Sequence, residues 1–138
     1  MRIEVDPLSS VPMYQQIRDR IVEGIAAGEL ATGERLVSIR QLAAVLEVNI
    51  ETVVKAYELL RHEGFLLTSN KSGSRIVSRR ERGGITVADL PEGWSERVTT
   101  LIAESVAAGL PTQELLDHVK GIADDFRVRG RAAHTNAG

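Results

Sequence analysis

Apolar and polar residues alternate between residues 30 and 77 in a pattern that predicts two short helices and a hairpin. The first helix has four apolar residues at the spacing of one buried face, namely Ile39, Leu42, Ala43 and Leu46. After a short turn, the second helix repeats that spacing with Val53, Ala56, Tyr57 and Leu60. Two strand-like runs follow, at residues 65–67 and 75–77, with a polar loop between them. This order of elements predicts a winged helix-turn-helix, which suits placing its second helix in the major groove of DNA.

The ends of both helices carry capping signals. Ser38, followed three positions later by Gln41, forms a capping-box pattern at the start of the first helix. Asn49 suits the start of the second helix, because its side chain accepts a hydrogen bond from an unpaired backbone N–H. Gly64 suits the end, since glycine readily takes the positive φ of a helix terminus. The face opposite the second apolar stripe is predicted to be exposed, and it carries Glu51, Lys55, Glu58 and His62.

Two further helices are predicted beyond residue 94, each with one apolar stripe. The first stripe includes Val98, Leu101 and Ile102, and the second includes Leu115, Val119, Ile122 and Phe126. An antiparallel pair of this length cannot bury both stripes by itself, so it needs a partner surface. Self-association is the favoured interpretation, because symmetric dimers are the commonest oligomers. The alternative is that the pair packs back onto its own winged domain.

The predicted fold is mainly α-helical with one small β-hairpin. Residues 1–78 are expected to form the winged helix-turn-helix domain, and residues 79–94 a linker containing a charge run, two glycines and a proline. Residues 95–128 are expected to form the helical dimerisation element. Residues 129–138 are expected to be a disordered tail.

Composition argues against secreted, membrane-spanning and catalytic proteins. The 138 residues include no cysteine, which excludes disulfides and thiolate metal sites. The N-terminal residues lack the apolar core of a signal peptide, and no apolar run approaches the roughly 20 residues of a membrane span. His62, His118 and His134 stand apart without metal-binding spacing, and no phosphate-binding glycine loop occurs. We therefore expect a cytoplasmic protein that is not an enzyme and needs no cofactor or metal.

The overall charge balance argues mildly against nucleic-acid binding. The net charge is −2, whereas proteins that neutralise phosphates tend to be basic. A local cluster around the hairpin and its exit compensates, and it consists of Lys71, Arg75, Arg79, Arg80 and Arg82, with Glu81 among them. Directly after a wing, such a cluster favours contact with a nucleic-acid backbone over a merely solvated loop.

Residues 12–77 resemble the GntR family of bacterial transcription regulators. The matching positions are 12–17, 28–36, 38–43, 48–49, 52–53, 55–57, 60 and 63–64. The short tail of two helices is similar to the family's YtrA-like branch, in which the tail is the dimerising part. The resemblance implies a homodimeric regulator, most often a repressor, that binds a palindromic double-stranded DNA operator.

The resemblance also implies which residues contact DNA. Arg40 would do so at the start of the first helix of the motif, and Asn49, Thr52 and Lys55 from the recognition helix. The wing would approach the DNA at Ser72 and Gly73. The complete set of candidate DNA-binding residues is Ser38, Arg40, Asn49, Ile50, Glu51, Thr52, Lys55, Lys71, Ser72, Gly73 and Arg75.

Three departures from the family pattern fall on this surface. Val37 replaces the usual proline, and the recognition helix starts with Ile50 and Glu51 instead of proline-asparagine or a basic residue. The wing keeps one glycine, Gly73. These changes leave the predicted fold intact and bear on the preferred DNA sequence and on affinity.

The alternative function is a winged-helix protein-interaction module with weakened or lost DNA binding. Ile50 and Glu51 motivate it, because a carboxylate on the reading surface repels phosphate. The same carboxylate can instead accept a hydrogen bond from a cytosine amino group. The sequence identifies no small-molecule effector, which would have to bind at the dimer interface or beneath the wing.

Overall fold

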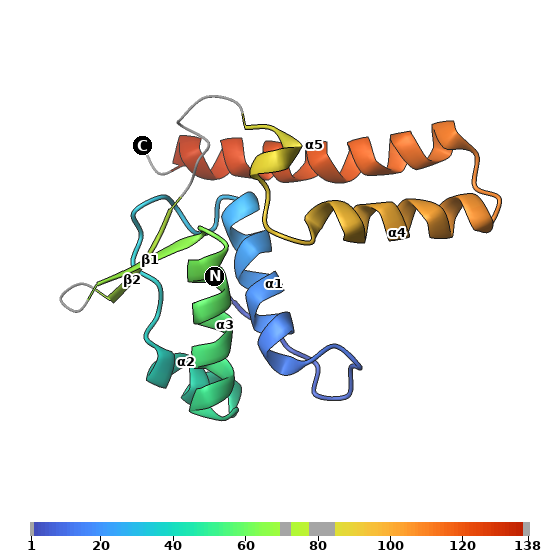
Figure 1. Cartoon of the computed structure of the whole chain (residues 1–138). Coiled ribbons are helices and arrows are strands. Elements are labelled where there is room, and N and C mark those ends of the chain that lie inside the picture. Colours follow the sequence, from blue (N-terminus) through green and yellow to red (C-terminus); the bar gives the residue numbers. More distant parts are fainter. Residues whose placement is uncertain (1, 70–72, 78–84, 137–138) are drawn as a thin grey trace.

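A winged domain and a pair of long helices make up the chain. The computed structural model describes residues 2–69, 73–77 and 85–136. The elements in chain order are α1 (Met13–Ala26), α2 (Ile39–Leu46), α3 (Ile50–His62), β1 (Leu66–Ser69), β2 (Gly73–Ile76), the 3-10 helix η2 (Val87–Asp89), α4 (Trp94–Ala107) and α5 (Thr112–Asn136). Figure 1 shows α1, α2, α3 and the hairpin gathered together, with α4 and α5 running antiparallel above them and extending to one side. The predicted fold class is confirmed.

Both predicted helix starts are confirmed. The Oγ of Ser38 accepts a hydrogen bond from the N–H of Gln41 at 3.2 Å, and the Oε1 of Gln41 accepts one from the N–H of Ser38 at 3.3 Å. The Oδ1 of Asn49 accepts a hydrogen bond from the N–H of Glu51 at 2.9 Å. Between the two helices, Glu47 has a φ of 56° in the left-handed region, where it ends α2. These local contacts set the turn that lets α2 and α3 share one core.

The core lies where the apolar stripes of α2 and α3 meet α1 and the hairpin. Its buried side chains are Ile17, Ile21, Leu30, Leu36, Leu42, Ala43, Val53, Ala56, Tyr57, Leu60, Leu66 and Ile76. Ile39 and Leu46, at the ends of the α2 stripe, are partly buried against this cluster. Both predicted stripes are therefore the inward faces of their helices. The opposite faces of both helices are exposed to solvent.

The wing is a ladder with a third strand-like segment beside the hairpin. β1 and β2 pair antiparallel, with Leu66 opposite Ile76. Residues 33–36 run along the other edge of β2, joined to it by backbone hydrogen bonds of 2.8 to 2.9 Å. Within this segment Arg35 forms an antiparallel bridge with Arg75. The chain leading into α2 is thereby held against the wing.

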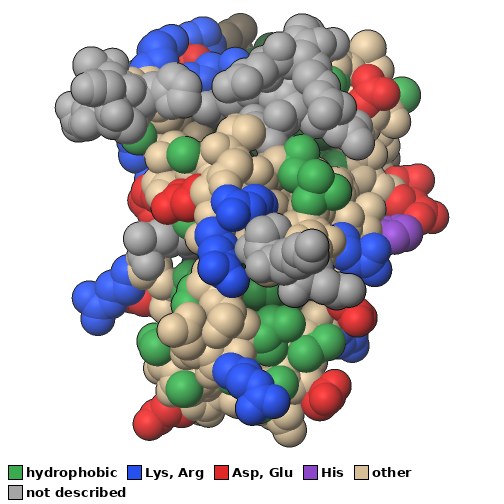
Figure 2. Space-filling view, turned by 90° about the vertical axis from the view of Figure 1, so that its left-hand side faces the viewer, with side chains coloured by type: hydrophobic (Ala, Val, Ile, Leu, Met, Phe, Trp, Pro, Cys, Tyr) green, Lys and Arg blue, Asp and Glu red, His purple; other side chains and the backbone are tan. Residues whose placement is uncertain are grey.

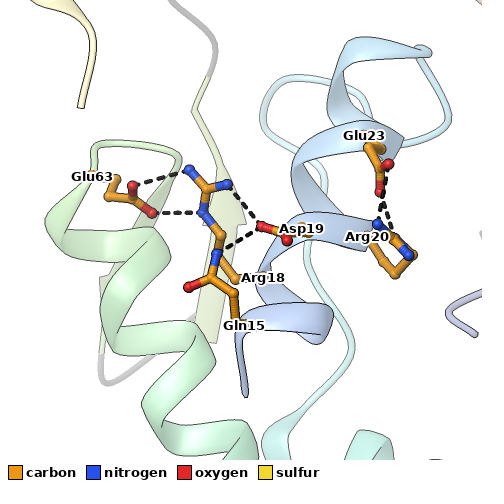
Figure 3. Close-up of polar contacts among 6 residues, drawn as sticks. All are labelled: Gln15, Arg18, Asp19, Arg20, Glu23 and Glu63. Carbon is orange, nitrogen blue, oxygen red and sulfur yellow. Dashed lines mark hydrogen bonds and ion pairs between the residues drawn. The ribbon is translucent and has the colours of Figure 1, made fainter. Parts of the chain in front are cut away.

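A largely buried ion pair fastens α1 to the end of α3. The Nε and Nη2 of Arg18 donate to the two carboxylate oxygens of Glu63 at 2.8 and 3.0 Å, and Nη1 donates to Asp19 at 3.0 Å (Figure 3). The side chains of Arg18 and Glu63 are only 9% and 11% exposed. Burial by itself would lower the pKa of Arg18, but the hydrogen bonds and charges of Glu63 and Asp19 raise it, so the guanidinium stays charged. The recognition helix is thus fixed to α1 at its C-terminal end.

The far end of α5 rests against the turn that follows α1. A Cβ added at Gly28 would lie 2.9 Å from the Cβ of Ala133 and 3.0 Å from the Cα of Gly130, so glycine allows this approach. Gly28 also has a φ of 75°, which glycine adopts without strain. Gly130 is buried by the contact. The helical tail is therefore joined to the winged domain through small residues.

This contact corrects one sequence-based prediction. The tail predicted to be disordered from residue 129 is helical through Asn136, so that prediction is wrong for residues 129–136, while residues 137 and 138 lie outside the described ranges. The physical reason is tertiary: packing of Gly130 against Gly28 supports the last turns of α5, which the local sequence does not reveal. The first part of the predicted linker, residues 79–84, also lies outside the described ranges.

Candidate nucleic-acid interface

The outward face of α3 carries the polar residues expected on it. Glu51, Lys55, Glu58 and His62 are all exposed. Ile50, which is 44% exposed, and the half-buried Thr52 complete the first turn. A carboxylate can accept a hydrogen bond from a cytosine amino group, and an apolar side chain can contact a thymine methyl group. The first turn of α3 therefore offers chemistry for reading bases, although it lacks the arginine that most often reads guanine.

Two of the candidate DNA-binding residues act as helix caps. The side-chain oxygens of Ser38 and Asn49 each accept a backbone N–H of the helix that follows. Both residues remain exposed. Capping is therefore their role within the chain, and their contact with DNA stays a prediction.

Lys55 packs against α1 instead of standing free. Its Nζ lies 4.0 Å from the centre of the Tyr14 ring, a cation–π contact. Such a contact at an exposed site contributes about 0.5–1 kcal/mol. It joins the recognition helix to α1 and restricts the directions in which the ammonium group can reach.

A groove separates the first turn of α2 from the wing. Its lining consists of residues 35–41 together with Tyr57, Thr68, Gly73 and Ser74. Arg40 is exposed on the α2 side of this groove. Figure 2 shows the molecule from the wing side, with Lys and Arg side chains in the middle of the face and Asp and Glu mainly toward its margins. A local positive surface thus exists on a chain whose net charge is −2.

The wing contributes Gly73 and Arg75 to this surface. Gly73 has a φ of 69°, which explains why this position keeps its glycine. Arg75 is exposed, and its Nη1 donates to the carbonyl of Gly33 at 3.0 Å. The other predicted cations and wing residues lie outside the described ranges: Lys71, Ser72, Arg79, Arg80 and Arg82.

Sequence reasoning missed Arg35, which also lines the groove. One signal was available, because Leu36 is apolar and its neighbours on an extended segment must point the other way. The pairing of Arg35 with Arg75 had no such signal, since the two residues are far apart along the chain.

Tyr57 connects the recognition helix to the chain before α2. Its side chain is buried, and its hydroxyl donates a hydrogen bond to the carbonyl oxygen of Val37 at 2.6 Å. Burial raises the pKa of Tyr57 well above the ordinary value of 10.0. The acceptor belongs to the backbone, so valine supplies it as well as proline does. Val37 is therefore compatible with the fold despite departing from the family pattern.

The predicted dimerisation residues lie along α4 and α5 and remain largely uncovered. Leu101 is 61% exposed, Val119 53%, Ile122 49% and Ile102 42%. Val98, Leu115 and Phe126 are half-buried. The two helices run antiparallel in Figure 1 but do not pack closely on each other. Packing onto the winged domain, the alternative considered for this tail, involves the far end of α5 and leaves the stripes open.

The described ranges hold no candidate metal site and no candidate membrane span. No group of three or more His, Asp or Glu side chains there is placed to hold a metal ion. Likewise, none of the helices in that part of the chain is long and apolar enough to cross a membrane.

Known proteins resemble this chain over the winged domain and over the tail as well. Residues 13–76 match the model of the gntR family of bacterial regulatory proteins. The HTH-type transcriptional repressor YtrA of Bacillus subtilis is 31% identical over 129 residues, which cover 91% of this chain and 95% of that protein. A transcriptional antiterminator from Listeria monocytogenes EGD-e has a crystal structure that superposes with a TM-score of 0.75 at 27% identity, over 91% of this chain and 92% of that one.

A second solved structure points to the same group of proteins. YtrA from Sulfolobus acidocaldarius, a GntR-family transcription factor, superposes with a TM-score of 0.59 at 36% identity, over 76% of this chain and 97% of that one. The winged domain and the helical tail are thus shared with transcription regulators. The chain is a DNA-binding transcription regulator and belongs to the GntR family.

Proposed function

We propose that this chain is a homodimeric repressor that binds a palindromic operator. Its reading surface is the exposed face of α3, with the start of α2 and the wing on either side. Its dimer forms through the apolar stripes of α4 and α5. The similarity to a transcriptional repressor from Bacillus subtilis supports the repressor assignment.

The observation that supports dimerisation is the exposed apolar stripe on α4 and α5. Leu101, Val119 and Ile122 each expose about half or more of their surface, at 61%, 53% and 49%. An exposed apolar stripe of this kind marks an interaction site. A second copy presents the same stripe, so a two-fold arrangement covers both stripes at once.

A two-fold dimer also matches the geometry of an operator. It presents two recognition helices to major grooves about 34 Å apart, which is one turn of DNA. The half-sites are then inverted repeats. In each half-site Arg40, Thr52 and Lys55 would contact DNA as the family resemblance implies, and Glu51 would select cytosine through its amino group.

The experiment that tests this function is a titration of the full chain with DNA from immediately upstream of its own gene. Arg40→Ala is expected to weaken binding by about 1–3 kcal/mol if the side chain contacts a base. Arg97→Ala removes the same charge from an exposed position on α4 and should leave the affinity unchanged. Unchanged affinity in both Arg40→Ala and Lys55→Ala would mean that the reading face lies elsewhere.

Glu51→Gln distinguishes DNA reading from protein docking. If Glu51 faces DNA, the variant should bind unrelated sequences more tightly, because one repulsive charge is removed. It should also discriminate less at one base pair of the half-site. If the change leaves binding to every duplex near zero, the winged domain serves as a protein-interaction module instead.

A further inference from the structure

Two arginines face each other across the wing. Arg35 and Arg75 are partners in an antiparallel bridge, so their side chains leave the same face of the ladder. Both are exposed. Like charges directly opposite on neighbouring strands destabilise a sheet. Within the described ranges, none of the ion pairs involves either arginine. The free protein therefore keeps a repulsive pair that nothing in this part of the chain neutralises.

The two guanidinium groups lean in opposite directions. Arg75 reaches toward the base of the wing, where its Nη1 donates to the carbonyl of Gly33 at 3.0 Å. Arg35 instead lies across Gly73. A Cβ added at Gly73 would be 3.2 Å from the Nε of Arg35 and 3.3 Å from its Nη2. The glycine thus leaves space for the guanidinium to lie against the wing backbone.

This placement brings Arg35 into the groove between α2 and the wing. Arg40 lines the same groove from the side of α2. The other polar side chains that line it are those of Ser38, Gln41, Tyr57, Thr68 and Ser74, all uncharged, and no Asp or Glu belongs to the lining. The positive end of the α2 helix dipole adds to the field at this point. The groove is therefore complementary to an anion.

We propose that Arg35 binds a phosphate of the DNA backbone in this groove, opposite Arg40. The inference rests on the proposed function, because it assumes that α3 and the wing approach one duplex. Such a contact gives the chain local phosphate binding despite its net charge of −2. A phosphate also neutralises the repulsion that Arg35 and Arg75 impose on the free protein.

The test is the salt dependence of binding to a random-sequence duplex of about three helical turns, roughly 30 base pairs. A random sequence suffices, because a phosphate contact contributes equally on every sequence. The full chain is compared with Arg35→Met, Arg35→Lys and Arg97→Met, the last being a charge-matched control on α4. Loss of one phosphate contact should reduce the slope of log affinity against log salt by about 0.9. Between about 50 and 200 mM salt, Arg35→Met should therefore lose about 3.5-fold less affinity than the wild type.

Arg35→Lys should keep most of the slope, since the charge remains, and Arg97→Met should match the wild type. Arg35→Met should also unfold at the same temperature as the wild type or higher, because the repulsion with Arg75 is gone. An unchanged slope in a folded Arg35→Met variant overturns this inference. If Arg40→Ala still weakens binding in that case, the proposed function stands. If the wild type binds no duplex at all, both fall together.

Discussion

Single side chains hold the reading surface to the core. Tyr57, which is 5% exposed, anchors α3 through its hydrogen bond to the Val37 carbonyl. Lys55 adds a contact on the other side of the helix, over the ring of Tyr14. The residues proposed to contact DNA therefore move with the core and not independently of it. The contact with Tyr14 also restricts the positions from which the Lys55 ammonium group can reach a phosphate.

Tyr57 gives the chain a stability that depends on pH. Its pKa in the folded protein is raised above the ordinary value of 10.0 by burial, so the folded state resists loss of the proton. The contribution is fully present below pH 10.0, the unfolded value, and is lost as the pH rises from there toward the folded value. We expect the free energy of unfolding in urea to fall above that pH. Tyr57→Phe should flatten this fall and cost about 0.5–1.5 kcal/mol at neutral pH, through the lost hydrogen bond.

Tyr14→Phe is the matched control, because Tyr14 is the other tyrosine of the chain. It keeps the ring beneath Lys55 and should retain the alkaline loss of stability. If the free energy of unfolding falls equally steeply at alkaline pH in the wild type and in Tyr57→Phe, other groups cause the fall.

The helices of the winged domain are fastened to one another by unequal contacts. The pair between Arg18 and Glu63 joins α1 to the end of α3 and is about 10% exposed, at 9% and 11% for the two side chains. Two residues further along α1, Arg20 pairs with Glu23 of the same helix, and those side chains are 43% and 48% exposed. Figure 3 shows both pairs. Only the first connects two elements, so only the first should matter to the fold.

Arg18→Met is expected to destabilise the protein by about 3 kcal/mol, because it leaves the carboxylate of Glu63 buried without its partner. Arg20→Met breaks a solvent-exposed pair and should cost less than about 1 kcal/mol. Urea denaturation followed by circular dichroism measures both. Equal losses in the two variants would contradict the distinction. Partial recovery in the double variant Arg18→Met with Glu63→Gln would confirm that the unpaired charge is the cause.

Over the described ranges, the chain consists of a winged domain and a helical tail, which touch through a small contact. The tail meets the winged domain where Gly130 and Ala133 of α5 approach Gly28. Away from that contact, α4 and α5 expose their apolar stripes. The winged domain has its own buried core and does not depend on the tail to complete it.

A chain that ends after Arg82 is therefore expected to stay folded, become monomeric and bind its operator more weakly. The two half-sites held by one dimer gain from effective concentration, a factor of about 10²–10⁴ that separate monomers lack. The full-length double variant Val119→Lys with Ile122→Lys should behave in the same way. Molar mass by light scattering and operator titration measure the two effects.

Gln113→Lys adds a charge to an exposed polar position of the same helix and serves as the control. It should remain dimeric with unchanged affinity. A shortened chain that is still dimeric would place the interface on the winged domain, where the half-buried Tyr14 of α1 is the next residue to replace, whereas Ile17 is fully buried in the core.

The sequence by itself determined the order of the elements and the faces of the helices. The stripes from Ile39 to Leu46 and from Val53 to Leu60 predicted the inward faces, and the caps at Ser38 and Asn49 predicted the helix starts. These features depend on contacts between residues within about one helical turn, so a short stretch of sequence is enough to predict them.

Only the tertiary structure decided which distant residues meet. It paired Arg35 with Arg75, set Lys55 over Tyr14 and kept the end of α5 helical beside Gly28. None of these contacts has a periodic signature, because each joins segments that come together only after the chain has folded. The local pattern of the sequence indicated the exposed polar face of α3 and the apolar stripes of α4 and α5. The positive groove beside that helix arises from the fold, because its two walls come from separate parts of the chain.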